Sequence, residues 1–425
     1  MLEILNQWNR WGAAKLKSGY ARDITSNIIP FLNTNEVVAL IGLRRAGKTT
    51  VLYQIMDTLE SEGVPKEAIL HMNFEEPAIA PTLGVETLDQ IYRTYREEIY
   101  PTGKAYLFFD EIQNVSHWEK WVRARNESEE IKIFITGSSA SLMSRELATV
   151  LTGRHVEFYV TPFSFKEILR LKDIKIPESK LKINPPPIIQ NVLKEYLTWG
   201  GFPEVILSDS IDRKKMLLKQ YFDDILFKDV AMRHQIRDLT VLRNIAVFLI
   251  TQTGCFFSIN RISKLFQISL EMASNYCSFI QESFLVDYLP YFSLKTAERN
   301  RNPQKIHVND LGLRQIASIS LSMDYGKCAE TLIYQHLQRK FRNDIFYWKG
   351  EQEVDFVIRS GNAIHSILQV AYDDLDDENT RQRELMSLEK AKAEFKNAEA
   401  NLIVGKVPKS PDKLMTPLWL FLLGN

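Results

Sequence analysis

One short stretch constrains the fold of this chain more than any other. Residues 42–49 read Gly-Leu-Arg-Arg-Ala-Gly-Lys-Thr and match the pattern GxxxxGK[ST] in full, between an apolar run ending at Ile41 and a helical pattern. The glycines let the backbone turn tightly, so that N–H groups point at phosphate oxygens, while Lys48 reaches the β- and γ-phosphates and Thr49 places a hydroxyl on Mg²⁺. We therefore expect ATP and Mg²⁺ as cofactors, bound by Gly42, Leu43, Arg44, Arg45, Ala46, Gly47, Lys48, Thr49 and Thr50.

Short β-rich runs alternate with helical patterns through the first 170 residues. The expected strands are Glu36–Ile41, Ala68–Phe74, Tyr106–Asp110, Ile131–Thr136 and Val156–Val160. The expected helices are Thr49–Glu60, Thr87–Tyr100, Trp118–Ser128 and Ala140–Leu151. This alternation predicts an α/β fold of the P-loop NTPase type, with a mainly parallel sheet and helices on its faces.

A pair of acids ends the apolar run 106–111, Tyr-Leu-Phe-Phe-Asp-Glu. Asp110 is expected to hold Mg²⁺ through water, and Glu111 to act as the general base on the attacking water. Having Glu beside Asp favours hydrolysis over mere binding. Ser138 either senses the γ-phosphate or caps the following helix, and Asn73 either holds Glu111 away from the water or is a plain edge amide.

Composition sets further limits. Lys+Arg and Asp+Glu each total 53, so no global field draws the chain to nucleic acid or membrane, and any DNA affinity needs a local patch. No apolar run approaches the roughly 20 residues that cross a bilayer, the first residues lack the layout of a signal peptide, and the three cysteines are scattered. We expect a cytoplasmic protein without a membrane segment, a disulfide scaffold or a zinc site.

Four domains are expected. The segment Asn184-Pro185-Pro186-Pro187 cannot continue a helix or a central strand, and it marks a boundary. The expected domains are a nucleotide-binding core at 1–184, a helical lid at 185–238, a winged helix at 239–318 and a small α/β domain at 319–425. Gly200-Gly201 would give the lid a hinge whose φ and ψ change with nucleotide.

Helical patterns near 259–266 and 269–282, followed by strands at Val286–Phe292 and Lys305–Val308, are typical of a winged helix. The second helix would enter a DNA major groove, yet residues 269–277 contain no Lys or Arg. Positive charge lies instead on the preceding helix and in the expected wing, at Arg261, Lys264, Lys295, Arg299, Arg301 and Lys305. These residues predict DNA contact through wing and helix. A winged helix that packs against protein is the alternative.

Together these stretches resemble AAA+ ATPases. More closely, they resemble a prokaryotic family, common in archaea, that joins such an ATPase to a winged helix and a restriction-endonuclease-like C-terminal domain of unassigned role. The matching stretches are Gly42–Thr50, Phe109–Gln113, Thr136–Ser139, Leu151–Arg154, Gly200–Pro203 and Glu353–Phe356. The resemblance implies that Arg154 reaches the nucleotide of a neighbouring subunit, with Arg145 as the second candidate and a plain surface arginine as the other option. The active form would then be a homo-oligomer, with a hexamer as one option.

Glu330 on a helix, Asp355 on a strand and a second strand ending Leu368-Gln369-Val370-Ala371 follow the layout of PD-(D/E)XK nucleases. In those enzymes the acids bind Mg²⁺ and a lysine orients the water. Ala371 stands where that lysine should be, so we expect a degenerate nuclease fold kept for DNA or partner binding. A residual metal site at Glu330 and Asp355, and an ordinary α/β domain, are the alternatives.

The combined expectation is an oligomeric ATP-hydrolysing protein that binds and remodels duplex or branched DNA. The first alternative is a nucleotide-gated switch that binds a protein, and the second is an ATP-dependent nuclease. A kinase or transferase is less favoured because no acceptor-site motif accompanies the loop.

Overall fold

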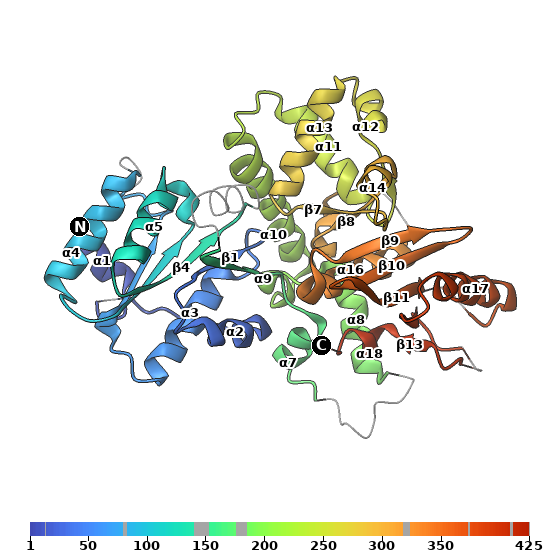
Figure 1. Cartoon of the computed structure of the whole chain (residues 1–425), viewed down its shortest axis with the longest axis horizontal. Coiled ribbons are helices and arrows are strands. Elements are labelled where there is room, and N and C mark those ends of the chain that lie inside the picture. Colours follow the sequence, from blue (N-terminus) through green and yellow to red (C-terminus); the bar gives the residue numbers. More distant parts are fainter. Residues whose placement is uncertain are drawn as a thin grey trace. The chain divides into compact units, whose positions relative to one another are not determined.

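The structure is a computed structural model that describes residues 1–12, 14–79, 83–139, 153–175, 185–317, 324–372, 375–408 and 411–424. It divides into two compact units, Met1–Thr161 with Glu282–Phe284, and Pro162–Gln281 with Leu285–Asn425 (Figure 1). The first unit thus ends before the expected boundary at 184, and the division into four domains stays a prediction. Within the described ranges, every helix is too short or too polar to cross a membrane.

The first unit is built on a five-stranded parallel sheet, of which Figure 1 labels β1 and β4. The strand order is β2-β3-β4-β1-β5. Its strands are β1 (Val37–Ile41), β2 (Ile69–Asn73), β3 (Ala105–Asp110), β4 (Ile131–Gly137) and β5 (His155–Tyr159). Every residue of β1, β3 and β4 is buried, as expected of central parallel strands covered on both faces.

The helices of the first unit are α1 (Leu2–Trp8), α2 (Asp23–Ile28), α3 (Lys48–Ser61), α4 (Val85–Glu98) and α5 (Trp118–Ser128). Helix α3 buries Val51, Leu52 and Ile55, which recur at the spacing of one helical face. The predicted α/β fold with a parallel sheet is confirmed. The helix expected at 140–151 lies outside the described residues.

The second unit begins with helices α7 (Phe165–Leu171), α8 (Pro187–Trp199), α9 (Pro203–Ile206), α10 (Ile211–Asp224) and α11 (Leu239–Thr251), with a π-helix, η6 (Ile225–Met232), between the last two. A capping box starts α7, because Ser164 and Glu167 each bond the other's backbone N–H. The described part of the region expected as a lid is therefore helical.

Residues Gly200-Gly201 connect α8 to α9 in a tightly packed junction. Gly201 N donates to Asp310 Oδ2 at 2.7 Å. A Cβ on Gly200 would lie 1.8 Å from Asp310 Oδ1, and one on Gly201 would lie 2.4 Å from the carbonyl oxygen of Phe163. Close approach of neighbouring atoms thus accounts for both glycines, which is a different reason from the expected hinge.

Helices α12 (Ile259–Phe266) and α13 (Leu270–Glu282) lie where the sequence predicts them. The same stretch of the chain also contains a three-stranded antiparallel sheet in the order β6-β8-β7. Its strands are β6 (Phe256–Phe257), β7 (Val286–Leu289) and β8 (Gln304–Val308). A short helix, α14 (Thr296–Arg301), interrupts the expected wing between β7 and β8. Lys305 on β8 is only 2 % exposed, so its placement among the charges of the wing surface is wrong.

The C-terminal part of the second unit contains a five-stranded sheet in the order β13-β12-β11-β10-β9. Its elements are α16 (Tyr325–Phe341), β9 (Ile345–Lys349), β10 (Glu353–Ser360), β11 (Ala363–Ala371), α17 (Glu378–Glu394), β12 (Glu399–Val404), β13 (Met415–Pro417) and α18 (Leu418–Phe421). Strands β9, β10 and β11 are antiparallel, and β12 and β13 continue the sheet in parallel with β11. An apolar core that includes Val357, Ile367, Leu388 and Leu402 joins α17 to this sheet. The expected C-terminal α/β region is confirmed.

Candidate nucleotide-binding site

The loop between β1 and α3 adopts a conformation that only its glycines allow easily. Gly42 has φ +146°, and a Cβ there would lie 2.2 Å from the carbonyl oxygen of Val160. Gly47, the N-cap of α3, has φ +98°. The N–H groups of residues 48–50 precede the bond from Val51 N to Gly47 O (3.1 Å), so they point out of the helix end. This amide cradle at a helix N-terminus fits the phosphates of a nucleotide.

The lysine and threonine of the loop lie beside the acids that end β3. Lys48 Nζ donates to the carbonyl oxygens of Gly42 (3.1 Å) and Leu43 (3.3 Å), and it lies 3.7 Å from Glu111 Oε1. Thr49 Oγ1 donates to Asp110 Oδ2 at 2.6 Å. The structure therefore brings together the four side chains that the two sequence motifs single out.

Asp110 is completely buried at the end of β3. Burial, together with the charge of Glu111, raises the pKa of Asp110 to about 6, although Thr136, Thr49 and Lys48 act in the opposite direction. A bound cation would favour the charged form of this carboxylate. The available ligands, a threonine hydroxyl and a carboxylate, are oxygen atoms of the kind that Mg²⁺ prefers.

Glu111 sits in the left-handed region, with φ +54°. Its backbone N–H donates to Thr136 Oγ1 at 2.9 Å, and that hydroxyl in turn donates to Asp110 Oδ1. Gln113 Nε2 donates to the Glu111 carboxylate. Thr136 and Gln113 were not among the predicted site residues. Both lie in stretches that the family resemblance already marked, which is the signal that could have identified them.

Two other predicted polar residues lie near these acids. Asn73 Nδ2 donates to Asp110 Oδ2 at 3.5 Å, and its Oδ1 accepts from Glu75 N at 2.8 Å. The amide bonded to Glu111 is therefore that of Gln113, whereas Asn73 bonds the neighbouring acid. Ser138 is fully buried directly after β4. The roles of Ser138 and Asn73 stay predictions.

Arg22 is hydrogen-bonded to the phosphate-binding loop, and it was not among the residues predicted from the sequence. Its Nη1 donates to the carbonyl oxygen of Ala46 at 2.8 Å, and its Nη2 to that of Thr161 at 2.6 Å. The side chain is almost fully buried. The guanidinium thus fixes the loop against the chain that follows β5. On the surface of the same loop, Arg44 pairs with Glu75 at 2.9 Å.

Arg154 lies at the end of the sheet where β1 begins, whereas the loop of its own chain lies at the end where β1 finishes. Its carbonyl oxygen accepts from Val37 N at 2.9 Å, at the start of β1, whereas the loop follows the end of β1. Five extended residues separate the two ends by about 16 Å. The side chain is half exposed and pairs with Glu127. Arg154 is therefore distant from the loop of its own chain, and its action on a neighbouring copy stays a prediction; Arg145 lies outside the described residues.

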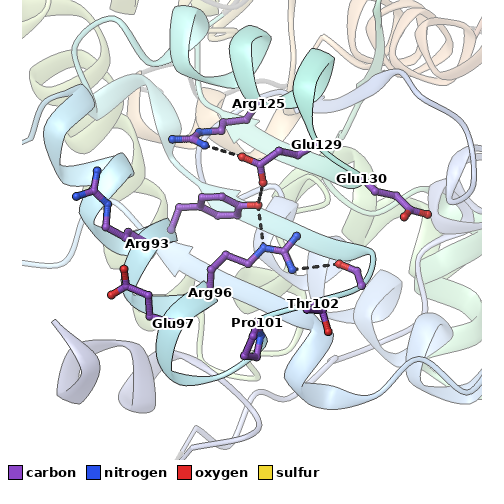
Figure 2. A pocket seen from close by; sticks show the side chains of 10 residues that line it. Arg93, Arg96, Glu97, Pro101, Thr102, Arg125, Glu129 and Glu130 are labelled. Atoms are coloured by element: carbon purple, nitrogen blue, oxygen red, sulfur yellow. Dashed lines mark hydrogen bonds and ion pairs between the residues drawn. The ribbon is translucent and has the colours of Figure 1, made fainter.

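A hollow of about 480 Å³ opens at the end of the sheet where the strands begin, between the end of α4 and the starts of β3 and β4 (Figure 2). Figure 2 shows Arg125 bonded to Glu129, and both Glu129 and Arg96 bonded to the ring hydroxyl between them. Arg96 Nε donates to the Tyr92 hydroxyl at 2.9 Å, and Arg125 contacts both Glu129 and Asp89. Arg96 and Arg125 thus have hydrogen-bond partners within the first unit.

In the second unit, the two acids expected as a residual metal site do come together. Glu330 Oε1 lies 2.8 Å and Asp355 Oδ1 lies 3.1 Å from the same atom, Lys305 Nζ. Burial lowers the pKa of Lys305, but the charges of Glu330, Asp355 and Glu353 outweigh it, so the pKa is raised well above its usual value. A lysine cation therefore sits where the sequence predicts a metal, and the metal role stays a prediction.

The residues expected to contact DNA are in part exposed. Arg261 and Lys264 are exposed on α12, one helical turn apart. Lys295 and Arg301 are exposed at the two ends of α14, whereas Arg299 is half-buried over the ring of Phe346. DNA contact stays a prediction.

Comparisons with known proteins bear on both units. Residues 34–169 match a family model described as an AAA domain. Residues 190–323 match a model described as a domain of unknown function, DUF8612.

Two solved structures show a weak likeness. The Aeropyrum pernix Orc1 protein in complex with DNA has a TM-score of 0.31 and 13% identity, covering 69% of this chain and 90% of that one. AMPPCP-bound DnaA from Aquifex aeolicus has a TM-score of 0.26 and 11% identity, covering 61% of this chain and 86% of that one. Both TM-scores are below 0.5, so they carry no argument about function.

Two relatives match most of the chain. The uncharacterized protein MJ1544 of Methanocaldococcus jannaschii is 34% identical over 390 residues, which are 90% of this chain and 83% of that protein. An uncharacterized protein of Haemophilus influenzae is 30% identical over 353 residues, which are 81% of this chain and 85% of that protein. The chain therefore belongs to the family of archaeal and bacterial proteins that these two relatives represent, and it carries an AAA domain at residues 34–169.

Proposed function

We propose that this protein binds ATP with Mg²⁺ and hydrolyses it. The observation that carries the proposal is the convergence of Lys48, Thr49, Asp110 and Glu111 at one edge of the parallel sheet. Thr49 Oγ1 lies 2.6 Å from Asp110 Oδ2, and Lys48 Nζ lies 3.7 Å from Glu111 Oε1. A strand ending in a single acid would explain Asp110 alone, but not its contact with a phosphate-binding loop.

Each side chain has a distinct role in this proposal. The loop N–H groups bind phosphate oxygens, and Lys48 turns from the loop carbonyls toward the β- and γ-phosphates. Thr49 and Asp110 hold Mg²⁺, which when bound offsets negative charge on the phosphates. Glu111, held by Gln113, accepts a proton from the water that attacks the γ-phosphorus, while the bond to the bridging oxygen breaks and ADP leaves.

The Glu111→Gln variant tests the hydrolysis step. It should bind ATP with near-parent affinity and lower kcat by about 100-fold or more, because the amide cannot accept the proton. Glu119→Gln is the matched control, since Glu119 is a similarly buried glutamate of the same unit, on α5. It should keep the parent kcat. Hydrolysis by Glu111→Gln at the parent rate would remove Glu111 as the general base.

We further propose that hydrolysis is coupled to binding and remodelling of duplex or branched DNA. The exposed cations Arg261 and Lys264 on α12, with Lys295 and Arg301 beside α14, support this proposal because phosphate contacts supply much of DNA affinity. These cations provide local positive charge, which DNA affinity requires in a chain whose net charge is zero. The protein-binding switch is the alternative function.

ATPase rates measured with single-stranded, duplex and four-way DNA at one stated salt concentration separate these functions. DNA should raise kcat several-fold, and the Arg261→Ala/Lys264→Ala double variant should lose that increase. The control is Lys215→Ala/Lys219→Ala, which removes two exposed lysines from one face of α10. Rates that no DNA changes would favour the protein-binding switch.

Subunit mixing tests the proposed role of Arg154 in an oligomer. Arg154→Ala and Lys48→Ala should each be inactive alone and regain activity when mixed, because one copy supplies the arginine and the other the loop. Arg123→Ala is the control, since Arg123 pairs with the same Glu127 carboxylate at 3.1 Å. It should keep its activity. A rate per chain that is independent of dilution would contradict a shared site.

The ATP-dependent nuclease is the second candidate function, and the meeting of Glu330 and Asp355 is the observation that favours it. Plasmid and branched DNA incubated with ATP and Mg²⁺ or Mn²⁺ provide the test. Cleavage that Asp355→Ala abolishes would support a nuclease, and intact DNA would end this candidate.

A further inference from the structure

The segment between β7 and β8, the expected wing, presents an apolar side chain to solvent. Leu294 is 84% exposed, the largest exposed fraction of any large apolar residue that the structure describes. It directly precedes Lys295, the N-cap of α14. Single exposed apolar residues are common on protein surfaces, so exposure alone does not indicate a role. The contacts around Leu294 decide whether this one has a use.

Hydrogen bonds fix the backbone on both sides of Leu294. Arg299 Nη2 donates to the carbonyl oxygen of Ser293 at 2.9 Å. Lys295 N donates to Ser293 Oγ at 3.0 Å, and that hydroxyl donates to Glu298 Oε2 at 2.8 Å. The residues before and after the leucine are thus tied to α14 and to each other. Leu294 therefore stands on an ordered turn, so less backbone entropy is lost when it meets a partner.

The same turn is anchored on the C-terminal sheet of the second unit. Phe292 N donates to the carbonyl oxygen of Tyr347 on β9 at 2.7 Å, and Tyr347 N donates to that of Pro290 at 3.0 Å. The ring of Phe292 meets that of Phe346 edge-on, with centroids 5.5 Å apart. The guanidinium of Arg299 lies 5.5 Å from the centroid of the Phe346 ring. A load applied at Leu294 is therefore carried by a folded sheet.

Positive charge predominates around the leucine. Residues 293–301 contain three cations and one acid, so their net charge is +2. Lys295 adjoins Leu294, and Arg301 ends α14, and both cations are exposed. The acid, Glu298, is bonded to Ser293. The turn thus offers an apolar tip with exposed cations on the same short segment, which is complementary to a polyanion.

This combination favours DNA over a lipid surface. Proteins that enter the minor groove contact phosphates through cations, while an apolar side chain slides between two base pairs and unstacks them. A membrane surface also attracts cations, but binding there depends on a wide apolar helix face, which one leucine does not provide. The turn around Leu294 therefore fits the groove of a duplex better than a membrane.

We propose that Leu294 is a wedge that enters the minor groove of bound DNA and unstacks one base step, while Lys295 and Arg301 contact the flanking phosphates. The inference rests on the proposed DNA binding and adds the group that deforms the duplex. Unstacking is least costly at a flexible or mismatched step. Mismatched or branched DNA should therefore bind more tightly than a perfect duplex.

A short duplex with one central mismatch beside a fluorescent base analogue tests the wedge, because unstacking raises the emission of the analogue. The parent should raise it at saturation. Leu294→Ala should lose most of that rise and change the Kd by less than about threefold, since phosphate contacts supply most of the affinity. Leu294→Phe should keep the rise, because phenylalanine also serves as a wedge. Leu207→Ala, which truncates an exposed leucine after α9, is the control and should behave as the parent.

The two cations have a separate readout. Lys295→Ala/Arg301→Ala should weaken binding and reduce its dependence on salt concentration, because fewer counterions are released. At saturating protein the emission should still rise, since Leu294 is present. An unchanged salt dependence would remove these two residues from the proposal.

The outcomes separate the wedge from DNA binding itself. If the parent binds the duplex and Leu294→Ala raises the emission equally, the wedge is overturned and the proposed DNA binding stands. If the parent binds none of the DNAs, both fall together. Vesicles of anionic lipid provide the last comparison. Binding to them that Leu294→Ala abolishes, with DNA emission unchanged, would assign the leucine to a membrane and overturn the wedge.

Discussion

Each of the two units contains a buried lysine close to acids, but the two lysines differ in their partners. In the first unit, Lys48 donates to two carbonyl oxygens of its own loop and lies 3.7 Å from one carboxylate. In the second unit, Lys305 lies within 3.1 Å of three carboxylates. Carbonyl groups carry no net charge, so a phosphate can replace them as partners of Lys48, whereas Lys305 is held by opposite charges. Burial alone therefore does not make a lysine available to a ligand.

Replacing both lysines by the same residue is the strongest test of this comparison. Lys305→Met should lower the free energy of unfolding by about 3–5 kcal/mol, because it leaves buried carboxylates without their cation. Lys48→Met should cost only about 1 kcal/mol, since it removes hydrogen bonds to neutral carbonyls. Urea denaturation of each variant measures the difference. Equal losses would mean that the two lysines are held alike.

Asp310 isolates the effect of burial on a carboxylate whose near partners are backbone N–H groups. Burial raises the pKa of Asp310 to about 7, although the N–H groups of Gly201 and Gly312 donate to it. Because the folded pKa exceeds the unfolded value near 4, Asp310 stabilises the fold at low pH, and this contribution is lost as the pH rises to about 7. Asp310→Asn should remove about 2–3 kcal/mol of the pH dependence between pH 5 and 7. Urea denaturation of the parent and of Asp310→Asn at both pH values checks this. If the free energy of unfolding changed with pH equally in both proteins, the raised pKa of Asp310 would be contradicted.

Arg22 sharpens the comparison, because it is a buried cation that donates to two carbonyl oxygens, as Lys48 does. Arg22→Lys keeps the charge but cannot reach both Ala46 and Thr161 with one planar group. We expect ATP affinity to fall about tenfold, since a charge-assisted hydrogen bond contributes about 1.5–3 kcal/mol. Fluorescent-nucleotide binding measures it. Parent affinity in Arg22→Lys would show that the loop holds its shape without Arg22.

The smallest effect is expected at the surface of the same loop. Arg44 pairs with Glu75, which is 43% exposed. Because exposed ion pairs contribute about 0–1 kcal/mol, Glu75→Ala should change the KM for ATP by less than about threefold. Steady-state kinetics check this. A larger change would mean that Arg44 contributes to the site through its pairing.

The sequence predicts the first unit well because its signals are local. Apolar runs such as 106–110 have the composition of buried parallel strands, and the spacing of Gly42, Lys48 and Thr49 is that of a phosphate-binding loop. Asp110 and Glu111 were found because they follow such a run directly. Thr136 and Gln113 lay inside recognised stretches, but their pairing with the acids depends on how neighbouring strands align.

The residues that the sequence could not predict have distant partners. Arg22 bonds residues that are 24 and 139 positions away. Lys305 contacts acids that are 25 and 50 positions away. In addition, β8 is buried at four consecutive positions, so its side chains do not alternate between core and solvent. A basic residue in such a strand looks like surface charge until the C-terminal acids are placed around it.

Glu111 holds a backbone conformation, φ +54°, that glycine adopts without penalty and that other residues adopt at a cost of about 1–3 kcal/mol. If stability of the fold were the sole requirement, glycine would be favoured at position 111. The first unit instead keeps an acid there, at this cost in resistance to unfolding, and the carboxylate of that acid lies 3.7 Å from Lys48 Nζ of the loop. The proposed chemistry and the endurance of the fold thus make opposite demands on a single residue.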